Sequence, residues 1–451
     1  MNDTIVAIST KLGEGAISII RVSGPESINI VNKLFKGKDL TKVTSHTINY
    51  GFINDGIKDI DEVLVSIMRA PKTFTREDIV EVNCHGGIAP TLKILELINQ
   101  AGARLAEPGE FTKRAFLNGR IDLTQAEAVM DIIQSKTDAN RSLALSSLEG
   151  NLKNYITTFR DKLKYLLANI EVNIDYPEYY DIEEITLEDI KKTITDLKVD
   201  LQDLITRSVE RLIVKNGIKT IIIGRPNVGK SSILNTFLKE DKAIVTNIEG
   251  TTRDLVEGEI IFDGIELSLI DTAGIRETDN IVEKIGVEKS LSLIDNADLI
   301  IVVLNSSEEL TDNDKFILDK VKDRNPIIVL NKNDLKAKLH KEDFTFDHIV
   351  STNTNSFTGI DSLKQEIKKM FNLDEIKEQD YTYLANNRQL LLAKQAKKNL
   401  EEAEKSLLAD APVDIIEIDL RAVFDTLGEI TGENYSDELL DELFKDFCVG
   451  K

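Results

Sequence analysis

The sequence predicts a multidomain α/β and α fold: an N-terminal α+β domain, then a helical bundle interrupted by an inserted doubly wound α/β domain. Three observations carry this prediction. Short β-rich runs lie among turns in residues 1–118, residues 217–375 alternate apolar strand-like runs with helical segments, and helical patterns flank that alternation on both sides. We therefore expect the two parts of the bundle at 119–216 and 376–451.

In the N-terminal domain, strand-like runs occur at 16–22 (AISIIRV) and 62–67 (EVLVSI). Four polar groups stand out beside such runs, namely Arg21, Glu81, His85 and Arg120. Charges that line a cleft next to apolar residues suit a small anionic or amide-bearing ligand. Cys84 has no such setting, and we expect it to be a small packing residue.

Helix signals surround the inserted domain. A capping-box pattern at 124–127 (TQAE) predicts one helix start, and a second at 186–189 (TLED) predicts another. Pro177 is expected to break the preceding helix, and Gly428 is expected to end the helix at 413–427. Apolar residues repeat at helical spacing within the first part, at Ile156, Phe159, Leu163, Leu166, Ile170, Ile174, Ile190, Ile194, Leu197, Leu201, Leu204 and Ile205.

The most specific motif lies at 224–231 (GRPNVGKS), directly after the apolar run 220–223. It fits the template G-x-x-x-x-G-K-[ST], whose backbone N–H groups curl around a polyphosphate. Lys230 is placed to reach the outer phosphates, and the Ser231 hydroxyl suits Mg²⁺. The chain is therefore expected to bind a nucleotide in a strand–loop–helix unit.

Three further motifs support a nucleotide site, and one of them indicates that the base is guanine. Asp271 opens DTAG at 271–274 after an apolar run, where a carboxylate suits a water-mediated hold on Mg²⁺. Asp334 closes NKND at 331–334, and its carboxylate can accept two hydrogen bonds that guanine donates and adenine does not. The segment 250–254 (GTTRD) supplies hydroxyls for the γ-phosphate and Mg²⁺. Ser351 and Thr352 form the weakest of the nucleotide-binding sequence elements.

The hydrolytic device differs from that of small signalling GTPases, because Ile275 stands where they often carry a water-orienting Gln. Two candidates replace it. The amide oxygen of Asn227 can help to hold a monovalent cation against the phosphates, and Glu283, in the segment 281–286, can position the water. Hydrolysis is then expected to need no protein activator.

Composition sets limits on the class of protein. The chain has 451 residues, a formal net charge of −22 and 41% hydrophobic residues, which fits a folded multidomain protein without a broad basic surface for nucleic acid. Cys84 and Cys448 lie far apart, so no disulfide framework is expected. With neither a basic leader nor a run long enough to span a bilayer, the sequence predicts a cytoplasmic protein.

The order of domains and four motifs resemble one family over essentially the full length. The motifs are GEGAISIIRVSG at 13–24, HGG at 85–87, PGEFTKRAFLNG at 108–119 and FCVGK at 447–451. Together they resemble the MnmE (TrmE) family of tRNA-modification GTPases. The resemblance implies that the inserted domain is a Ras-like GTPase domain.

The resemblance also implies an activity that the nucleotide motifs alone do not. Family members bind a tetrahydrofolate derivative (5-formyl- or 5,10-methylene-tetrahydrofolate) in the N-terminal domain and form a homodimer through it. With the FAD-dependent partner MnmG, as a heterotetramer, they add a (carboxymethyl)aminomethyl-type group to C5 of the wobble uridine, position 34, of certain tRNAs. GTP-driven dimerisation of the GTPase domains and hydrolysis gate this reaction. With so acidic a chain, we expect MnmG to supply much of the grip on tRNA.

By position, the resemblance assigns roles to individual residues. Arg21, Glu81 and Arg120 are expected to bind the folate, and Glu283 is expected to position water. The Mg²⁺ ligands are Ser231 and Thr252, and the K⁺ ligands are Asn227, Thr251 and the backbone carbonyls of Thr246 and Ile248. The full set expected to bind GTP is Gly224, Asn227, Val228, Gly229, Lys230, Ser231, Ser232, Thr246, Asn247, Ile248, Gly250, Thr251, Thr252, Asp271, Thr272, Ala273, Gly274, Asn331, Lys332, Asp334, Ser351 and Thr352.

The C-terminal tail, up to Lys451, allows two interpretations. A residue four from the end of a chain is usually frayed and inert, but the resemblance gives Cys448 a role near the folate and tRNA chemistry as a nucleophile, a proton donor or a positioning group. Three positions depart from the family pattern. Arg120 stands where Lys is usual, Arg76 replaces a usual Gly, and Gln389 replaces a common His.

Two other classes of protein remain open at this point. One is a regulatory or ribosome-assembly GTPase with a cation-assisted domain, although no dedicated basic RNA-binding domain is present. The other is a folate-dependent one-carbon transferase with a vestigial nucleotide domain, which four intact guanine-nucleotide motifs oppose. Neither alternative accounts for all three regions of the chain.

Overall fold

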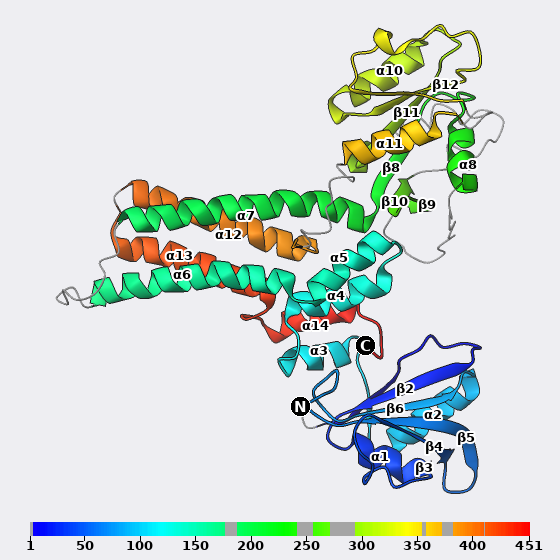
Figure 1. Ribbon diagram of the computed structural model, residues 1–451, viewed down its shortest axis with the longest axis vertical. Coiled ribbons are helices and arrows are strands. Elements are labelled where there is room, and N and C mark those ends of the chain that lie inside the picture. The colour runs from blue at the N-terminus through cyan, green and yellow to red at the C-terminus, as the bar shows by residue number, and fades with distance from the viewer. Residues whose placement is uncertain are drawn as a thin grey trace. The chain divides into compact units, whose positions relative to one another are not determined.

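The structure is a computed structural model that describes residues 3–175, 187–240, 256–270, 294–353, 358–371, 382–409 and 411–451 (Figure 1). The chain forms two compact units. The first comprises Met1–Met130, Leu148–Leu197 and Leu392–Lys451, and the second comprises Asp131–Ser147 and Lys198–Leu391. The inserted character of the nucleotide domain is therefore visible in the connectivity, because the chain leaves the first unit and returns to it.

The first unit contains a seven-stranded sheet in the order β3-β4-β5-β6-β2-β1-β7. All neighbouring strands are antiparallel except β1 and β7, which are parallel. The strands are β1 (Ile5–Ile8), β2 (Ile17–Ser23), β3 (Phe35–Lys36), β4 (Thr47–Asn54), β5 (Asp59–Met68), β6 (Ile79–His85) and β7 (Arg104–Leu105).

One face of this sheet is buried beneath helices α1 (Ser27–Leu34) and α2 (Ile88–Gln100). Alternate residues of the strands, such as Val63, Val65 and Ile67 of β5, point into that core, as the period of two requires. Cys84 is buried in the same core, which confirms the prediction that it is a packing residue.

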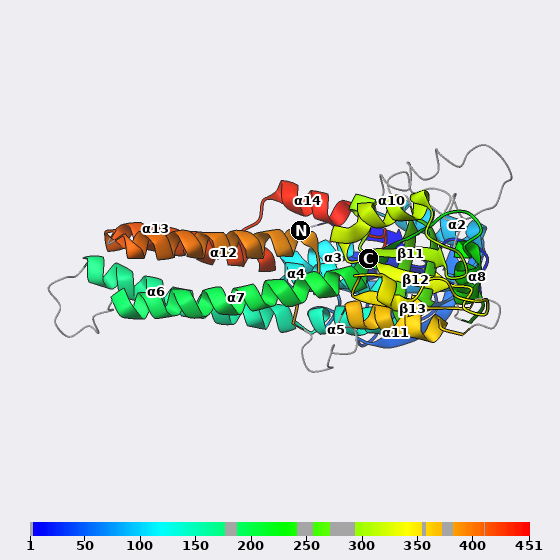
Figure 2. The ribbon, with the colours of Figure 1, turned by 90° about the horizontal axis from the view of Figure 1, so that it is seen from above.

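The helices of the first unit include α3 (Glu110–Leu117), α6 (Asn151–Asp175), α13 (Val413–Thr431) and α14 (Asp437–Lys445). Figure 2 shows α6 and α13 side by side, with α12 (Asn387–Leu408) beside α13. The predicted apolar stripe of α6 is buried from Ile156 to Ile170, whereas the Ile174 side chain lies outside the described residues. Helix α14 packs its Leu440 and Phe444 on α3.

Two helix signals in the sequence were misread. Helix α4 (Leu123–Gln134) begins before Thr124, because the Asp122 carboxylate accepts hydrogen bonds from the Thr124 hydroxyl at 2.6 Å and the Gln125 N–H at 3.0 Å. Gly428 does not end α13, which continues to a left-handed Gly432. A Cβ on Gly428 would lie 3.2 Å from the Arg160 guanidinium, so this glycine makes room for a packed side chain. Pro177 and Thr186 lie outside the described residues.

The second unit contains the inserted domain, a six-stranded sheet in the order β13-β12-β11-β8-β10-β9. Only β9 is antiparallel to its neighbour, as expected of a doubly wound fold with one antiparallel edge strand. Helices cover both faces of the sheet. The strands are β8 (Ile218–Ile223), β9 (Val256–Phe262), β10 (Ile265–Ile270), β11 (Leu299–Asn305), β12 (Ile327–Asn331) and β13 (His348–Ser351).

The described helices of the second unit include α5 (Asp138–Leu148), α8 (Lys230–Glu240), α10 (Asp312–Val321), α11 (Ile360–Met370) and the C-terminal part of α7 (Leu187–Asn216). Short 3₁₀ helices lie at η1 (Ile294–Asn296), η2 (Lys322–Arg324) and η3 (Lys341–Asp343). None of the described helices combines the length and the hydropathy needed to cross a bilayer.

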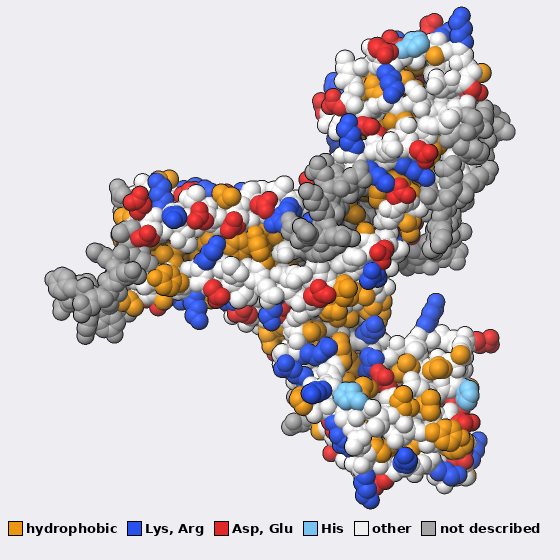
Figure 3. Space-filling model, in the orientation of Figure 1, with side chains coloured by type: hydrophobic (Ala, Val, Ile, Leu, Met, Phe, Trp, Pro, Cys, Tyr) orange, Lys and Arg blue, Asp and Glu red, His pale blue; other side chains and the backbone are white. Residues whose placement is uncertain are grey.

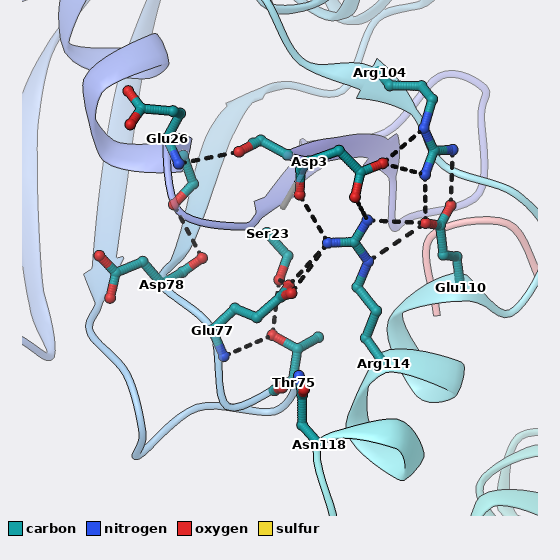
Figure 4. Close-up of polar contacts among 12 residues, drawn as sticks. Asp3, Ser23, Glu26, Thr75, Glu77, Asp78, Arg104, Glu110, Arg114 and Asn118 are labelled. Atoms are coloured by element: carbon teal, nitrogen blue, oxygen red, sulfur yellow. Dashed lines mark hydrogen bonds and ion pairs between the residues drawn. The ribbon is translucent and has the colours of Figure 1, made fainter. Parts of the chain in front are cut away.

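A buried charge cluster joins distant segments of the N-terminal domain (Figure 4). The guanidinium of Arg114, 1% exposed, lies 2.8 Å from the Asp3 carboxylate, 3.1 Å from Glu77 and 3.0 Å from Glu110. Arg104 contacts Asp3 and Glu110 from the other side, at 2.7 and 2.6 Å. These pairs fasten α3 to β7, to the start of β1 and to the loop that follows β5.

Replacing Arg114 with Met is expected to cost about 3–5 kcal/mol of unfolding free energy, because the largely buried Glu77 carboxylate loses its ion-pair partner and Glu110 keeps only Arg104. The measurement is urea unfolding followed by a probe in the N-terminal domain. Arg104→Met is the matched control; Arg104 is nearly half exposed, so its loss is expected to be about 1 kcal/mol. Equal losses for the two variants would contradict the assignment of Arg114 as the centre of the cluster.

Candidate functional site

The phosphate-binding loop lies between β8 and α8, where the sequence predicts it. A Cβ on Gly224 would come within 2.4 Å of the Val303 carbonyl oxygen, so only glycine fits there. The Lys230 ammonium donates to the carbonyl oxygens of Gly224 and Arg225 at 2.8 and 2.9 Å, and burial lowers its pKa. The lysine is thus held inside the loop, and Ser231 and Ser232 follow it in the first turn of α8. This arrangement suits the binding of a polyphosphate.

Asn331 brings three of the predicted nucleotide elements together. Its fully buried side chain donates to the Val228 carbonyl oxygen in the phosphate loop at 2.8 Å, and accepts from the Thr352 hydroxyl at 3.1 Å. The Asn333 N–H also donates to the Thr352 carbonyl oxygen, at 3.2 Å. NKND, the 351–352 segment and the phosphate loop therefore form one site at the carboxyl ends of parallel strands.

The sequence reading missed the anchor of the phosphate loop. Arg225 pairs with Glu308, and its Nε lies 3.3 Å from the Asp314 carboxylate. Asp314 also forms a capping box with Thr311 at the start of α10. A basic residue in the loop was the available signal, but its partners lie more than 80 positions away.

Several predicted residues lie outside the described part of the chain. They include Glu283 and the residues of the three segments 246–248, 250–252 and 271–274. The described strands β9 and β10 connect those segments, because β9 begins at Val256 and β10 ends at Ile270. Among the described residues, no group of three or more His, Cys, Asp or Glu side chains could hold a metal ion.

Lys136, between α4 and α5, holds the β9–β10 hairpin. Its ammonium lies 2.6 Å from the Glu259 carboxylate of β9 and 3.0 Å from that of Glu266 in β10. The residues between α4 and α5 are thus tied to the strand pair that separates the predicted γ-phosphate-sensing segments.

Two of the predicted folate residues, Arg21 and Glu81, lie on the second face of the N-terminal sheet, and the third, Arg120, follows helix α3. Arg21 and Glu81 are directly opposite each other on β2 and β6, and the Arg21 Nε lies 2.9 Å from the Glu81 carboxylate. The Arg21 guanidinium also lies 5.7 Å from the centre of the Phe111 ring of α3. The Arg120 guanidinium also lies over an aromatic ring, 4.9 Å from the centre of the Phe74 ring.

The C-terminal tail is bound at this face, so it is not frayed. The Gly450 carbonyl oxygen accepts hydrogen bonds from the Arg21 guanidinium at 3.1 Å and the Ser9 hydroxyl at 3.0 Å. The Cys448 carbonyl oxygen accepts from the N–H groups of Gly109 and Lys451, at 3.3 and 3.2 Å. These contacts fix the backbone of the tail while the Cys448 side chain stays exposed.

His85, grouped with Arg21, Glu81 and Arg120 from the sequence, pairs with a carboxylate outside that set. Its Nδ1 lies 2.7 Å from the Asp61 carboxylate, and the hydrogen bond with Asp61 raises the pKa of His85. It shares a strand face with Glu81 four residues away, so it stands further along the sheet.

Together the two units define a multidomain GTPase whose guanine-nucleotide domain is inserted into a chain with a separate polar site. Two family models match: "GTP-binding protein TrmE N-terminus" over residues 4–120 and "MnmE helical domain" over residues 123–448. The chain belongs to the MnmE (TrmE) family of tRNA-modification GTPases.

Full-length relatives agree with this assignment. The chain is 52% identical to the tRNA modification GTPase MnmE of Streptococcus thermophilus, with 100% of this chain and 98% of the relative covered. It is 49% identical to that of Bacillus pumilus, with both chains fully covered. Since these matches extend through all the domains, they favour a GTPase of tRNA modification over the two alternatives considered from the sequence.

Solved G domains also align with parts of the chain. The G domain of the T. maritima FeoB iron transporter aligns at 25% identity and a TM-score of 0.26, covering 34% of this chain and 97% of that one. Aquifex aeolicus Era aligns at 26% identity and a TM-score of 0.26, covering 40% and 66%. With scores this low, the assignment rests on the family models and the full-length relatives.

Replacing Asp334 with Asn is expected to exchange guanine for xanthine as the preferred base. The new side-chain amide can donate a hydrogen bond to the carbonyl group that xanthine carries where guanine has its amino group. Guanine, in contrast, loses the charged carboxylate that accepted its hydrogen bonds. Affinity for GTP should fall by ~100-fold or more, and XTP should bind in its place. Titration with fluorescent GTP and XTP analogues measures this. Binding of XTP shows that the variant is folded, and unchanged preference for GTP would contradict the site.

Proposed function

We propose that this chain is a K⁺-activated GTPase that acts with MnmG on C5 of the wobble uridine, position 34, of certain tRNAs. It adds a (carboxymethyl)aminomethyl-type group, with one carbon from a tetrahydrofolate derivative. The observation that carries this proposal is the C-terminal tail bound beside the Arg21–Glu81 pair, in a chain that also holds a guanine-nucleotide site. A reactive side chain and a small-molecule site are thereby close together.

The chemistry of the N-terminal site fits a folate. The Glu81 carboxylate accepts the hydrogen bonds that an amino-pyrimidinone edge donates, and the guanidinium groups of Arg21 and Arg120 suit carbonyl and carboxylate oxygens. When bound, 5-formyl- or 5,10-methylene-tetrahydrofolate would supply the one-carbon unit. FAD is assigned to MnmG.

Cys448 is the reactive group that we assign to this site. Its thiol is exposed, while the hydrogen bonds of Cys448, Gly450 and Lys451 hold the backbone around it. Whether Cys448 acts as a nucleophile, a proton donor or a positioning group, its role requires a backbone that is fixed in this way. Glu283 is assigned to the other catalytic task, positioning the water for GTP hydrolysis.

Potassium is assigned to the phosphate loop. Asn227 adopts a left-handed backbone, with φ of 61°, within the loop that holds Lys230. Its side-chain oxygen is a suitable K⁺ ligand, and a cation against the phosphates stabilises the charge that develops during hydrolysis. Thr251 and the carbonyls of Thr246 and Ile248 complete the proposed K⁺ site, and Ser231 and Thr252 bind Mg²⁺.

The gating of modification by GTP has a physical route in the second unit. Loops that order on a γ-phosphate move the strands to which they are attached. The strands β9 and β10 lie between the two proposed switch segments, and Lys136 ties both of them to the segment between α4 and α5. Nucleotide-dependent closure of paired GTPase domains would therefore be transmitted through Lys136 to helices α4 and α5.

A homodimer through the N-terminal domain is supported by its bare sheet face. Ile17, Ile48, Tyr50 and Leu64 are large apolar side chains that are 60%, 69%, 60% and 44% exposed. Tyr50 and Leu64 are directly opposite each other on β4 and β5. Figure 3 shows hydrophobic side chains gathered on this face, and such patches mark interfaces. We place the protein in the cytoplasm, with MnmG and tRNA as its further partners.

Potassium dependence is tested by GTP turnover in K⁺ and in Na⁺ at equal ionic strength. The natural protein is expected to be faster in K⁺ by about tenfold or more, because the ion replaces an arginine finger. Asn227→Ala is expected to be slow in both salts. Asn325→Ala, which changes another left-handed Asn in the same domain, is the control. Equal rates in both salts for the natural protein would remove the K⁺ assignment.

Dimerisation is tested by Tyr50→Glu, which places a charge at the centre of the exposed patch. Sedimentation equilibrium is expected to show a dimer for the natural protein and at least a tenfold weaker dimer for the variant, since a buried unpaired charge is costly. Ile57→Glu is the control, because Ile57 is 93% exposed between β4 and β5 and off the sheet face. If both variants stay dimeric, the interface lies elsewhere.

A further inference from the structure

Arg76 has a backbone conformation that its side chain does not favour. Its φ is 60°, in the left-handed region that glycine adopts without steric cost and that strains a residue with a long side chain. A strained backbone conformation persists when surrounding contacts stabilise it, and such conformations are common at functional sites, where a side chain must have one orientation. Arg76 lies in the loop between β5 and β6, the same loop that carries Phe74.

Two hydrogen bonds in opposite directions join this loop to the turn after α3. The Arg76 guanidinium donates to the Asn118 carbonyl oxygen at 2.9 Å, and the Asn118 amide donates to the Thr75 carbonyl oxygen at 2.6 Å. Thr75 is itself fully buried, with its hydroxyl 2.7 Å from that of Ser23 on β2. We call the contacts among Thr75, Arg76 and Asn118 the clamp.

The clamp also fixes Arg120, which lies two positions after Asn118. Gly119 turns the chain with φ of 67°, and the Arg120 N–H donates to the Ala115 carbonyl oxygen at 2.9 Å. The Arg120 guanidinium then lies over the Phe74 ring, 4.9 Å from its centre. Both the backbone of Arg120 and the ring beneath its side chain are thus fixed by the two segments that the clamp joins.

We propose that Arg76 is a positioning residue for the folate site, which acts by holding Arg120 over Phe74. This inference rests on the proposed role of Arg120 in folate binding. A guanidinium is planar, and its donors are useful only when the plane is correctly oriented, so an arginine at this position needs such support more than a lysine would. Arg76 does not itself need to touch the ligand.

The test uses Arg76→Gly, because glycine takes a φ of 60° without strain and the backbone is expected to keep its course. The probe is 5-formyltetrahydrofolate, titrated into the full-length protein by calorimetry. The dissociation constant is expected to rise by roughly three- to tenfold, as when one hydrogen bond to a charged group is lost. The Tm and the rate of GTP hydrolysis are expected to stay unchanged. A Tm that falls with the affinity would make Arg76 a structural residue and overturn the proposal.

His46→Gly is the matched control, since His46 is exposed in the same domain and also has a φ of 60°. It is expected to leave the affinity for 5-formyltetrahydrofolate unchanged. If the natural protein does not bind the probe, the proposed function fails. If the natural protein binds it and Arg76→Gly binds it equally well, only the present inference fails.

A double-mutant cycle with Arg120→Lys separates positioning from direct contact. If Arg76 acts through the planar guanidinium of Arg120, then Arg76→Gly should weaken binding by less than twofold once lysine stands at 120. An equal loss in both backgrounds would mean that Arg76 contacts the ligand itself, and would overturn the positioning role.

Discussion

The Arg21 guanidinium is the point on which the N-terminal site depends. It contacts the Glu81 carboxylate, the Phe111 ring and the Gly450 carbonyl oxygen, which come from a strand, a helix and the last residues of the chain. An arginine can do this because its planar group offers donors along its edge and an apolar face. One side chain therefore joins the sheet to the tail that carries Cys448, and the proposed one-carbon chemistry follows from that junction.

The two units are organised by the same principle. In each, a side chain of the sheet contacts a distant segment: Arg21, on one face of the first sheet, with Gly450, and Asn331, at the carboxyl end of β12 in the second, with Val228. Long-range hydrogen bonds of this kind fix side-chain geometry more firmly than the loops that carry them could alone.

Much of the fold and of the nucleotide site could be predicted from the sequence, because those signals are local. The phosphate loop and NKND are short motifs that directly follow apolar runs, and the helical stripes repeat at fixed spacing. The contacts that the sequence could not predict join distant residues, such as Arg225 with Asp314 and Arg114 with Asp3. Gly428 was misread because its role is to admit Arg160 from another helix. Arg76, noted only as a departure from the family pattern, lies in one clamped region with Arg120, which the resemblance assigned to the folate.

The most direct test of the role of the tail is a reconstituted modification reaction with a chain that ends at Phe447. The reaction contains MnmG, unmodified tRNA, GTP, 5,10-methylenetetrahydrofolate, ammonium and glycine, and the wobble uridine is analysed by mass spectrometry while phosphate release is followed. We expect the shortened chain to hydrolyse GTP at the natural rate in K⁺ and to form no C5-modified uridine. Modification at the natural rate would contradict the assignment of Cys448 as the reactive group beside the folate site.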